Sequence, residues 1–394
     1  MRLIKVAAAA LNQTPLDWDQ NCQNIFSAIE AARDQDASIL CLPELCITGY
    51  GCEDAFQSAG VRRTALSVLE EVAPATAGMI VSVGLPISYR RNVYNAACLL
   101  CDGRVVGFVG KQNLAGDGIH YEPRWFRPWP ANTQGDLSFA GQQYPLGDLV
   151  FDCGGIRIGF EICEDAWVAD RPGERLSQLG VDVILNPSAS HFAFGKNEVR
   201  RKFVLEGSQA FDVSYVYSNL VGNESGRAIY DGETMIASGG AMLAEGRRFS
   251  FTEHQVTSAV VDIEKNRMSS QVRRAQQEQL RILSVSEKSE EYGRRVEKKM
   301  RAAGLRVSGD YRAEKLGAKI RDAQLELIPY MCIVGPRDAE NDTVSLRDRI
   351  EGDLGAMKIS AAVAKFQEEI KSRTVRQTFG GDAGFGEQGS SNEY

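Results

Sequence analysis

The chain has 394 residues, of which 25% are charged and 43% apolar, and its formal net charge is −7. This length exceeds one ordinary hydrophobic core and predicts two domains, and the balanced composition excludes collagen-like and other fibrous classes. Residues 281–376 hold 20 Lys and Arg against 16 Asp and Glu, so the negative charge lies in the rest of the chain and the later segment is the one suited to meeting an anion.

From the start to about Val261, short apolar runs alternate with helix-like segments, which predicts a layered α/β domain. The amphipathic helices are expected at Asp19–Gln35 and Asn197–Ala210. The strands are expected at Ile4–Leu11, Ser38–Leu42, Met79–Gly84, Asn95–Cys101, Ile156–Phe160, Val181–Leu185, Val213–Tyr217 and Ser258–Ile263.

A second, smaller α/β series follows a polar stretch, residues 264–280, that has no strand pattern. We therefore expect domains over residues 1–265 and 280–378, a linker over 266–279 and a disordered Gly/Ser-rich tail over 379–394. In the second domain we expect strands at Arg281–Val285, Arg306–Gly309 and Tyr330–Val334, helices at Glu290–Ala303, Lys315–Glu326 and Ser360–Lys371, and a hairpin before the last helix.

The cysteines indicate the compartment. There are nine, at positions 22, 41, 46, 52, 98, 101, 153, 163 and 332, with one CxxC pair in an apolar run. This usage is typical of reduced intracellular thiols, so we expect a cytoplasmic protein. The apolar stretch at residues 1–11 is too short for a signal peptide. No apolar run approaches the roughly 20 residues that span a bilayer, so we expect no membrane segment. The three histidines lack ligand spacing, so we expect no metal site.

Three polar groups each end a predicted strand: Glu44, Lys111 and Cys163. Each alone has an ordinary explanation, as a helix-terminal charge, a surface lysine or a core thiol. Because open α/β folds gather their ligand sites at strand C-termini, however, the three are expected to converge. A thiol beside a base is the arrangement that a covalent nucleophile needs.

These contexts resemble the nitrilase, or carbon-nitrogen hydrolase, superfamily over about residues 1–265. Within it, four ordered segments look like the glutaminase domain of glutamine-dependent NAD synthetases: residues 44–50, 111–126, 161–167 and 186–196. The resemblance implies a four-layer α-β-β-α sandwich, a homodimer or larger assembly, and hydrolysis of glutamine to glutamate and ammonia.

The resemblance also implies roles for individual residues. Cys163 would be the nucleophile, Glu44 the base and Lys111 the cation that stabilises the oxyanion and raises the thiolate share. Glu122 would help to position the substrate amide. The amino-acid end of the substrate would meet Glu164, Trp167, Ser190 and Lys196, although related enzymes have Arg at the last position, and a lysine cannot form the same two-pronged contact.

No cofactor is expected for this hydrolysis. Complete synthetases of this type carry a Ser-Gly-Gly-x-Asp-Ser loop that binds pyrophosphate, and the only similar string, at 238–243, lacks the Asp-Ser and is interpreted as a hairpin turn. We therefore expect no ATP or NAD site and no ATP-dependent synthetase domain in the sequence.

Residues 280–378 resemble the C-terminal anticodon-binding domain of threonyl-tRNA synthetases. The resemblance implies that Arg321, Asp338 and Arg347 contact anticodon bases, whereas Ala313 replaces an asparagine that often reads a base. Two alternatives to the glutaminase hypothesis therefore stay open. In the first alternative, the chain is a tRNA-binding module fused to a vestigial hydrolase. In the second, it is an amidase that acts on another linear amide or on a nitrile.

Overall fold

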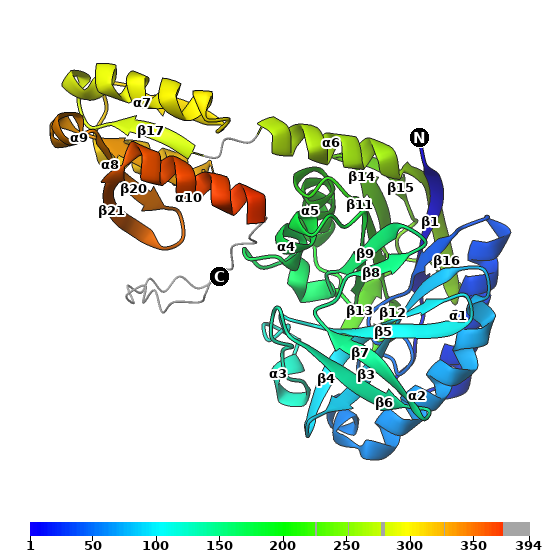
Figure 1. The fold of residues 1–394 in the computed structure, drawn as a ribbon. Helices are drawn as coiled ribbons and strands as arrows, with labels where there is room; N and C mark the ends of the chain where they lie inside the picture. The colour runs from blue at the N-terminus through cyan, green and yellow to red at the C-terminus, as the bar shows by residue number, and fades with distance from the viewer. Residues whose placement is uncertain (225–226, 251, 277–279, 327, 373–394) are drawn as a thin grey trace. The chain divides into compact units, whose positions relative to one another are not determined.

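The computed structural model describes residues 1–372 except 225–226, 251, 277–279 and 327 (Figure 1). The chain divides into two compact units, Met1–Gln271 and Val272–Tyr394. The tail predicted over residues 379–394 lies outside the described residues. Among the described helices, none is both long enough and apolar enough to cross a bilayer.

The first unit contains two large sheets. One has the strand order β16-β1-β2-β3-β4-β5-β7-β6. Its strands are β1 (Leu3–Leu11), β2 (Ile39–Cys41), β3 (Ile80–Tyr89), β4 (Asn92–Cys101), β5 (Arg104–Gly110), β6 (Gln134–Phe139), β7 (Gln142–Gly147) and β16 (His254–Asp262). The other has the order β15-β14-β11-β10-β9-β8. Its strands are β8 (Phe151–Cys153), β9 (Ile156–Phe160), β10 (Val183–Ser188), β11 (Ser214–Asn219), β14 (Thr234–Ser238) and β15 (Ala241–Glu245).

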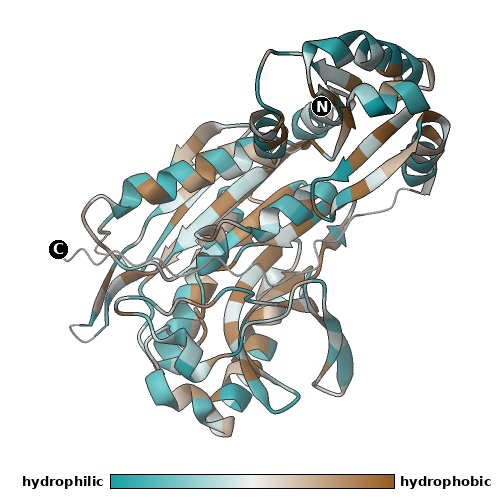
Figure 2. Cartoon of the chain, turned by 90° about the vertical axis from the view of Figure 1, so that its left-hand side faces the viewer, coloured by the Kyte–Doolittle hydropathy of each residue, from teal (hydrophilic) through white to brown (hydrophobic). Residues whose placement is uncertain are grey.

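The two sheets pack face to face through small and branched apolar residues, such as Val6 and Ile39 on one sheet and Ile158 and Val183 on the other. Helices cover the outer faces: α1 (Trp18–Asp34) and α2 (Ala59–Val72) pack on the first sheet, and α4 (Pro172–Gln178) and α5 (Lys196–Ala210) on the second. Figure 2 shows hydrophobic residues concentrated in the strands. The predicted α-β-β-α sandwich is confirmed: central strands such as β4, β10 and β11 are buried along nearly their whole length, whereas the edge strands β6 and β15 are partly exposed.

Shorter elements complete the first unit. They are α3 (Glu122–Trp125), the ribbon β12 (Val221–Glu224) with β13 (Ala228–Asp231), and the 3-10 turns η1 (Glu53–Gln57), η2 (Ala73–Thr76) and η3 (Cys163–Ala166). The string at 238–243 is the turn between β14 and β15, as predicted: Ser238 pairs with Ala241, and Gly239 and Gly240 both have positive φ. The polar segment interpreted as a linker is helical over α6 (Ile263–Gln276).

The second unit has one sheet in the order β18-β17-β19-β20-β21. Its strands are β17 (Leu280–Ser284), β18 (Val307–Asp310), β19 (Tyr330–Val334), β20 (Thr343–Asp348) and β21 (Gly352–Lys358). Its helical elements are η4 (Glu287–Ser289), α7 (Glu290–Ala302), α8 (Leu316–Leu325), α9 (Pro336–Asn341) and α10 (Ile359–Ser372). Every element predicted for this unit is present, and β20 with β21 forms the expected hairpin.

Candidate active site

Glu44 lies just beyond the C-terminal end of β2 and is almost fully buried. Its Oε1 accepts hydrogen bonds from Asn95 Nδ2 and Lys111 Nζ, both at 2.7 Å. Its Oε2 accepts the backbone N–H of Ala189 at 2.9 Å. The next residue, Leu45, has φ +50°, a conformation that non-glycine residues adopt at a cost and that is frequent at functional sites.

Lys111 follows the last residue of β5 and has no exposed surface. Its Nζ donates to Glu44 Oε1 and to Glu122 Oε1, each at 2.7 Å. Glu122 begins α3, and its Oε2 accepts the backbone N–H of Ala115 at 3.0 Å. The buried ammonium is therefore held between two carboxylates that come from different loops.

Cys163 begins the turn η3 directly after the strand β9 and its two-residue extension, and is 5% exposed. Its φ is +46°, so the nucleophile candidate sits on a strained turn. The charges of Glu44, Lys111 and Glu122 all act on its sulfur, as does the backbone amide of Ala189 that donates to Glu44. The structure thus brings the three predicted groups into one buried cluster.

Burial dominates the electrostatics of this cluster. It raises the pKa of Glu44 to about 7, although the neighbouring Lys111 acts in the opposite direction. Lys111 itself stays protonated, because Glu122 and Glu44 outweigh the burial of its ammonium and raise its pKa. Burial and the charge of Glu44 raise the pKa of Cys163, and Lys111 only partly offsets them. Lys111 thus acts on the thiol in the predicted direction, but burial outweighs it, so the thiol is the favoured form in the resting site.

The predicted residues for the amino-acid end of a substrate lie around this cluster. Ser190 is buried, and among the described residues its Oγ has no hydrogen-bond partner. Lys196 begins α5, and its Nζ lies 5.2 Å from the ring centroid of Trp167. Burial lowers the pKa of Lys196, whereas the charges of Cys163 and Glu164 both act to raise it. Burial raises the pKa of Glu164.

The residues predicted to contact RNA lie in the second unit. Arg321 is exposed on α8, and Arg347, on β20, has a buried Nε without a hydrogen-bond partner among the described residues. Asp338 lies on α9, and its carboxylate already accepts the backbone N–H of Gly335 and the hydroxyls of Thr343 and Ser345. Asp338 therefore has a structural role at the start of α9.

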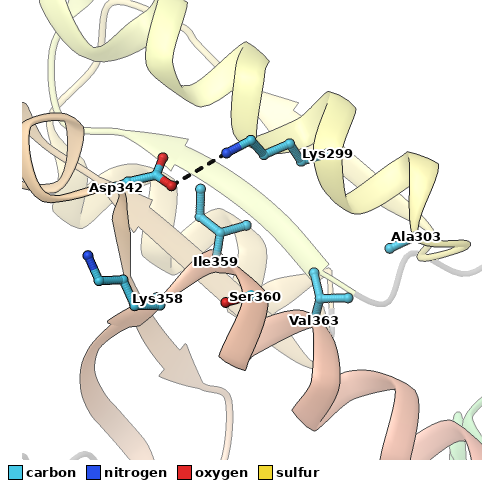
Figure 3. Close-up of a pocket in the computed structure, with 7 residues that line it drawn as sticks. All are labelled: Lys299, Ala303, Asp342, Lys358, Ile359, Ser360 and Val363. Atoms are coloured by element: carbon cyan, nitrogen blue, oxygen red, sulfur yellow. Dashed lines mark hydrogen bonds and ion pairs between the residues drawn. The ribbon is translucent and has the colours of Figure 1, made fainter.

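The second unit also has a hollow of about 350 Å³ between α7, the residue that follows α9, the end of β21 and the start of α10 (Figure 3). Lys299 and Asp342 form an ion pair of 3.5 Å across it, and Lys358 Nζ donates to the backbone carbonyl of Asn341. Its remaining lining is Ala303, Ile359, Ser360 and Val363. Both lysines thus already have partners within the unit.

Residues 5–267 match the family model described as carbon-nitrogen hydrolase. The chain belongs to the carbon-nitrogen hydrolase family. Residues 279–369 match the anticodon binding domain model, so this hydrolase chain carries a second domain of anticodon-binding type.

Relatives of this hydrolase include glutamine-dependent NAD(+) synthetases. That of Rattus norvegicus is 34% identical over 67% of this chain and 38% of its own length, and the putative one of Schizosaccharomyces pombe is 31% identical over 67% and 39%. The chain therefore spans about two fifths of the length of these curated relatives. The synthetase structure from Cytophaga hutchinsonii has 42% identity and a TM-score of 0.62, covering 73% of this chain and 49% of that one. An amidase of Nesterenkonia, at 21% identity and a TM-score of 0.55, covers 69% of this chain and 94% of its own and shares the fold.

Sequence reasoning missed a residue that joins the nucleophile turn of this hydrolase to the lysine loop. Asp165, 2% exposed, accepts the backbone N–H groups of Gln112 and Asn113 at Oδ1, at 3.2 and 2.7 Å. Its Oδ2 accepts the N–H of Ile162 at 2.9 Å. One carboxylate thus forms hydrogen bonds both with the residues that follow Lys111 and with the residue that precedes Cys163. The sequence signal was an acidic residue two positions after the cysteine.

Sequence reasoning also missed Tyr50, His120 and His191, which lie next to the predicted residues. Tyr50 O–H donates to Glu122 Oε1 at 2.7 Å. From the sequence the two histidines were considered only as metal ligands, whereas in the structure their ring nitrogens contact each other at 2.8 Å. The described residues contain no group of His, Cys, Asp and Glu side chains arranged to hold a metal ion.

Proposed function

We propose that this hydrolase releases ammonia from the side-chain amide of glutamine through a thioester on Cys163. The observation that carries the proposal is the buried ammonium of Lys111, held at 2.7 Å from both Glu44 and Glu122 beside the cysteine. The names of the relatives, which are glutamine-dependent, support glutamine as the amide.

In the first step Glu44 removes the proton of the Cys163 thiol as the sulfur attacks the amide carbon. A carboxylate with a pKa raised to about 7 suits this task, because it is basic enough to accept a proton and still ionised near neutral pH. The C=O π bond opens onto oxygen. The resulting oxyanion faces the Lys111 ammonium, and a backbone N–H beside the cysteine completes its stabilisation.

In the second step the tetrahedral intermediate collapses and the C–N bond breaks. The proton held by Glu44 passes to the departing nitrogen, so ammonia leaves and a thioester stays on Cys163. Water then attacks the thioester, with Glu44 taking one of its protons and returning it to the sulfur. The second water proton leaves on the γ-carboxyl group of the product, which ionises to glutamate once it is released. Each cycle consumes one water and restores the thiol.

Glu122 contributes in two ways. Its Oε1 holds Lys111, and its Oε2 accepts one backbone N–H, which leaves room on that oxygen for one more donor. The NH₂ group of the substrate amide is a donor of this kind. Glu122 therefore suits both holding the lysine and orienting the amide.

The amino-acid end of glutamine carries one charge of each sign. In this proposal Lys196 meets the α-carboxylate, Glu164 the α-ammonium, and Ser190 Oγ, which has no hydrogen-bond partner among the described residues, either group. Trp167, under the Lys196 ammonium, supports that side chain through a cation–π contact.

The direct test is release of ammonia and glutamate from glutamine by the purified chain. Cys163→Ala should abolish turnover, whereas Cys153→Ala, a half-buried thiol on β8, should leave it within about twofold of the native rate. Turnover that survives Cys163→Ala contradicts the proposal. Preferential hydrolysis of amides without an α-carboxylate would instead assign the site to another linear amide.

RNA binding by the second unit is a second candidate function, favoured by its match to the anticodon binding domain. The arginines Arg321 and Arg347 carry this candidate, since the oxygens of Asp338 already accept hydrogen bonds within the unit. A guanidinium recognises phosphate or a base edge through paired N–H donors.

Filter binding of threonine tRNA at moderate salt tests this candidate. Arg321→Ala/Arg347→Ala should lower retention at least tenfold, whereas Arg337→Ala/Arg349→Ala, which removes the same charge, should lower it less. Equal retention by the first double variant and the native chain contradicts specific RNA binding.

A further inference from the structure

An unbroken line of hydrogen-bonding groups leads from Glu122 to Lys196. Tyr50 O–H donates to Glu122 Oε1 at 2.7 Å, and Tyr50 Oη lies 3.1 Å from His120 Nδ1. His120 Nε2 lies 2.8 Å from His191 Nδ1. Lys196 Nζ lies 3.1 and 3.4 Å from the two ring nitrogens of His191. The catalytic steps above use neither histidine.

One assignment of protons satisfies the contacts of this line from Glu122 to the His191 ring. Tyr50 has a single proton and gives it to Glu122, so His120 Nδ1 must donate to the tyrosine oxygen. The other nitrogen of a neutral His120 then accepts the Nδ1–H of His191. His191 Nε2, 3.4 Å from Lys196 Nζ, is the ring nitrogen left to accept from the ammonium, although Nζ lies nearer to Nδ1, at 3.1 Å. A second proton on either ring would turn two donors toward each other, and the pKa of both histidines is indeed lowered, mainly by burial.

The two histidines connect loops that are far apart in the sequence. His120 lies between Lys111 and Glu122, and its ring packs edge-on against Tyr50, with centroids 5.7 Å apart. His191 lies between Ser190 and Lys196, and its backbone pairs with Tyr230 in an isolated bridge. The backbone of His191 is thus fixed independently, and its ring can serve to hold a neighbour.

Lys196 is the group that this line holds. Among the described residues no carboxylate lies within ion-pair distance of its Nζ, although the side chain is half-buried beside Trp167. Burial accordingly lowers the pKa of Lys196. A partly desolvated ammonium without a counter-ion gains most from a ligand that brings a negative charge.

We propose that His120 and His191 are positioning residues that hold the Lys196 ammonium where a substrate α-carboxylate binds, and that they thereby select amides bearing that carboxylate. This inference rests on the proposed hydrolysis of glutamine. It assigns the histidines no part in bond breaking, so they act on substrate binding and leave the chemical step intact.

The test compares His191→Asn with His191→Leu, two side chains of nearly equal shape. Asparagine can donate to His120 and accept from Lys196, whereas leucine can do neither. We expect the leucine variant to raise KM for glutamine about tenfold, the contribution of one well-placed hydrogen bond to a charged group, with kcat within about twofold of native. The asparagine variant should stay within about threefold in KM.

Two further measurements separate positioning from general damage. The inhibition constant of 4-aminobutanamide, which is glutamine with hydrogen in place of the α-carboxylate, should be unchanged in the leucine variant. His120→Leu should reproduce the KM increase, and His120→Leu/His191→Leu should be no worse than either single variant, because both belong to one line.

An unchanged KM in His191→Leu overturns the inference, as does an equal loss of kcat in the leucine and asparagine variants. Failure of the proposed function has a different signature. The native chain would then release no ammonia from glutamine before any variant is compared.

Discussion

Asp165→Asn tests whether the Asp165 carboxylate aligns the Cys163 turn with the loop that follows Lys111. The substitution keeps the size of the side chain and replaces one acceptor oxygen by an NH₂ donor. Four N–H groups now point at Asp165: three at Oδ1, from Gln112, Asn113 and the Asn113 side chain, and that of Ile162 at Oδ2. An amide oxygen can replace Oδ1, but its NH₂ group then faces the Ile162 N–H.

The magnitude follows from that opposed pair of donors. A buried N–H left without an acceptor costs about 1–3 kcal/mol. Because burial raises the pKa of Asp165 to about 7, loss of the charge itself adds little near neutral pH. We expect about 2 kcal/mol of destabilisation, or about 4–8 °C in Tm for a unit of this size. A shift of the Cys163 turn relative to Lys111 should lower kcat about 10- to 100-fold with a smaller change in KM.

Thermal unfolding and steady-state ammonia release measure these effects. Asp182→Asn is the control: Asp182 is 3% exposed and also accepts a backbone N–H, from Arg157 at 2.9 Å, but it pairs in addition with Arg267 and lies at the other end of β10. It should lower Tm comparably and leave kcat within about twofold. If Asp165→Asn behaves like this control, the carboxylate is only structural and the reasoning is refuted.

Three other predictions concern Glu44 and a buried ion network. Because Glu44 must be ionised to accept the thiol proton, kcat/KM should rise with pH through about 7 and level off above it; a flat profile from about pH 5.5 to 8.5 would contradict this role. Glu44→Gln should lower kcat about 10²- to 10⁴-fold in the ammonia assay, and a loss below tenfold would exclude it as the base. Arg200→Met should cost about 3–5 kcal/mol in thermal unfolding, since it removes the ion-pair partner of the buried Glu233 and leaves the buried Asp231 with Arg248 alone as its cation. Arg201→Met, which removes an exposed ion pair with Glu245, should cost under about 1 kcal/mol, and equal losses at the two positions would contradict the burial argument.

The sequence predicted the elements whose signal is local. The strands β1, β9 and β19 are mostly apolar, with one charged residue each in β1 and β9, and such runs are read directly from the chain. Glu44, Lys111 and Cys163 could be selected because each follows a buried strand, and strand ends gather at one edge of a sheet. The structure places the three together, but across two sheets: Glu44 and Lys111 follow β2 and β5 of one sheet, and Cys163 follows β9 of the other, which the rule for a single sheet does not predict.

Features that depend on which loops become neighbours could not be predicted. Asp165 contacts residues about fifty positions away, and His120 and His191 are about seventy apart. The hairpin β6–β7 was not predicted because it lies at the edge of the sheet and few of its residues are apolar. In β6 only Leu137 and Phe139 are buried, which leaves no apolar run in the sequence. The helix α6 was missed because its anchor is the distant ion pair of Arg267 with Asp182.

The charges of the site explain how such a buried cluster could operate in the proposed cycle. At rest, two carboxylates and one ammonium leave an excess of one negative charge around a neutral thiol. When Glu44 takes the thiol proton, it loses a charge as the oxyanion gains one, and when that proton leaves with ammonia, the carboxylate is restored. The net charge of the cavity is the same at every step, so no step requires a new charge to be desolvated. This balance requires Glu44 to take a proton from the thiol and then give it to the leaving amine, which is easiest when the pKa of its carboxyl is near theirs. Burial raises the pKa of Glu44 to about 7, which is nearer to both than the pKa of an exposed glutamate. The burial that keeps Cys163 protonated at rest is therefore the same feature that makes Glu44 a competent base.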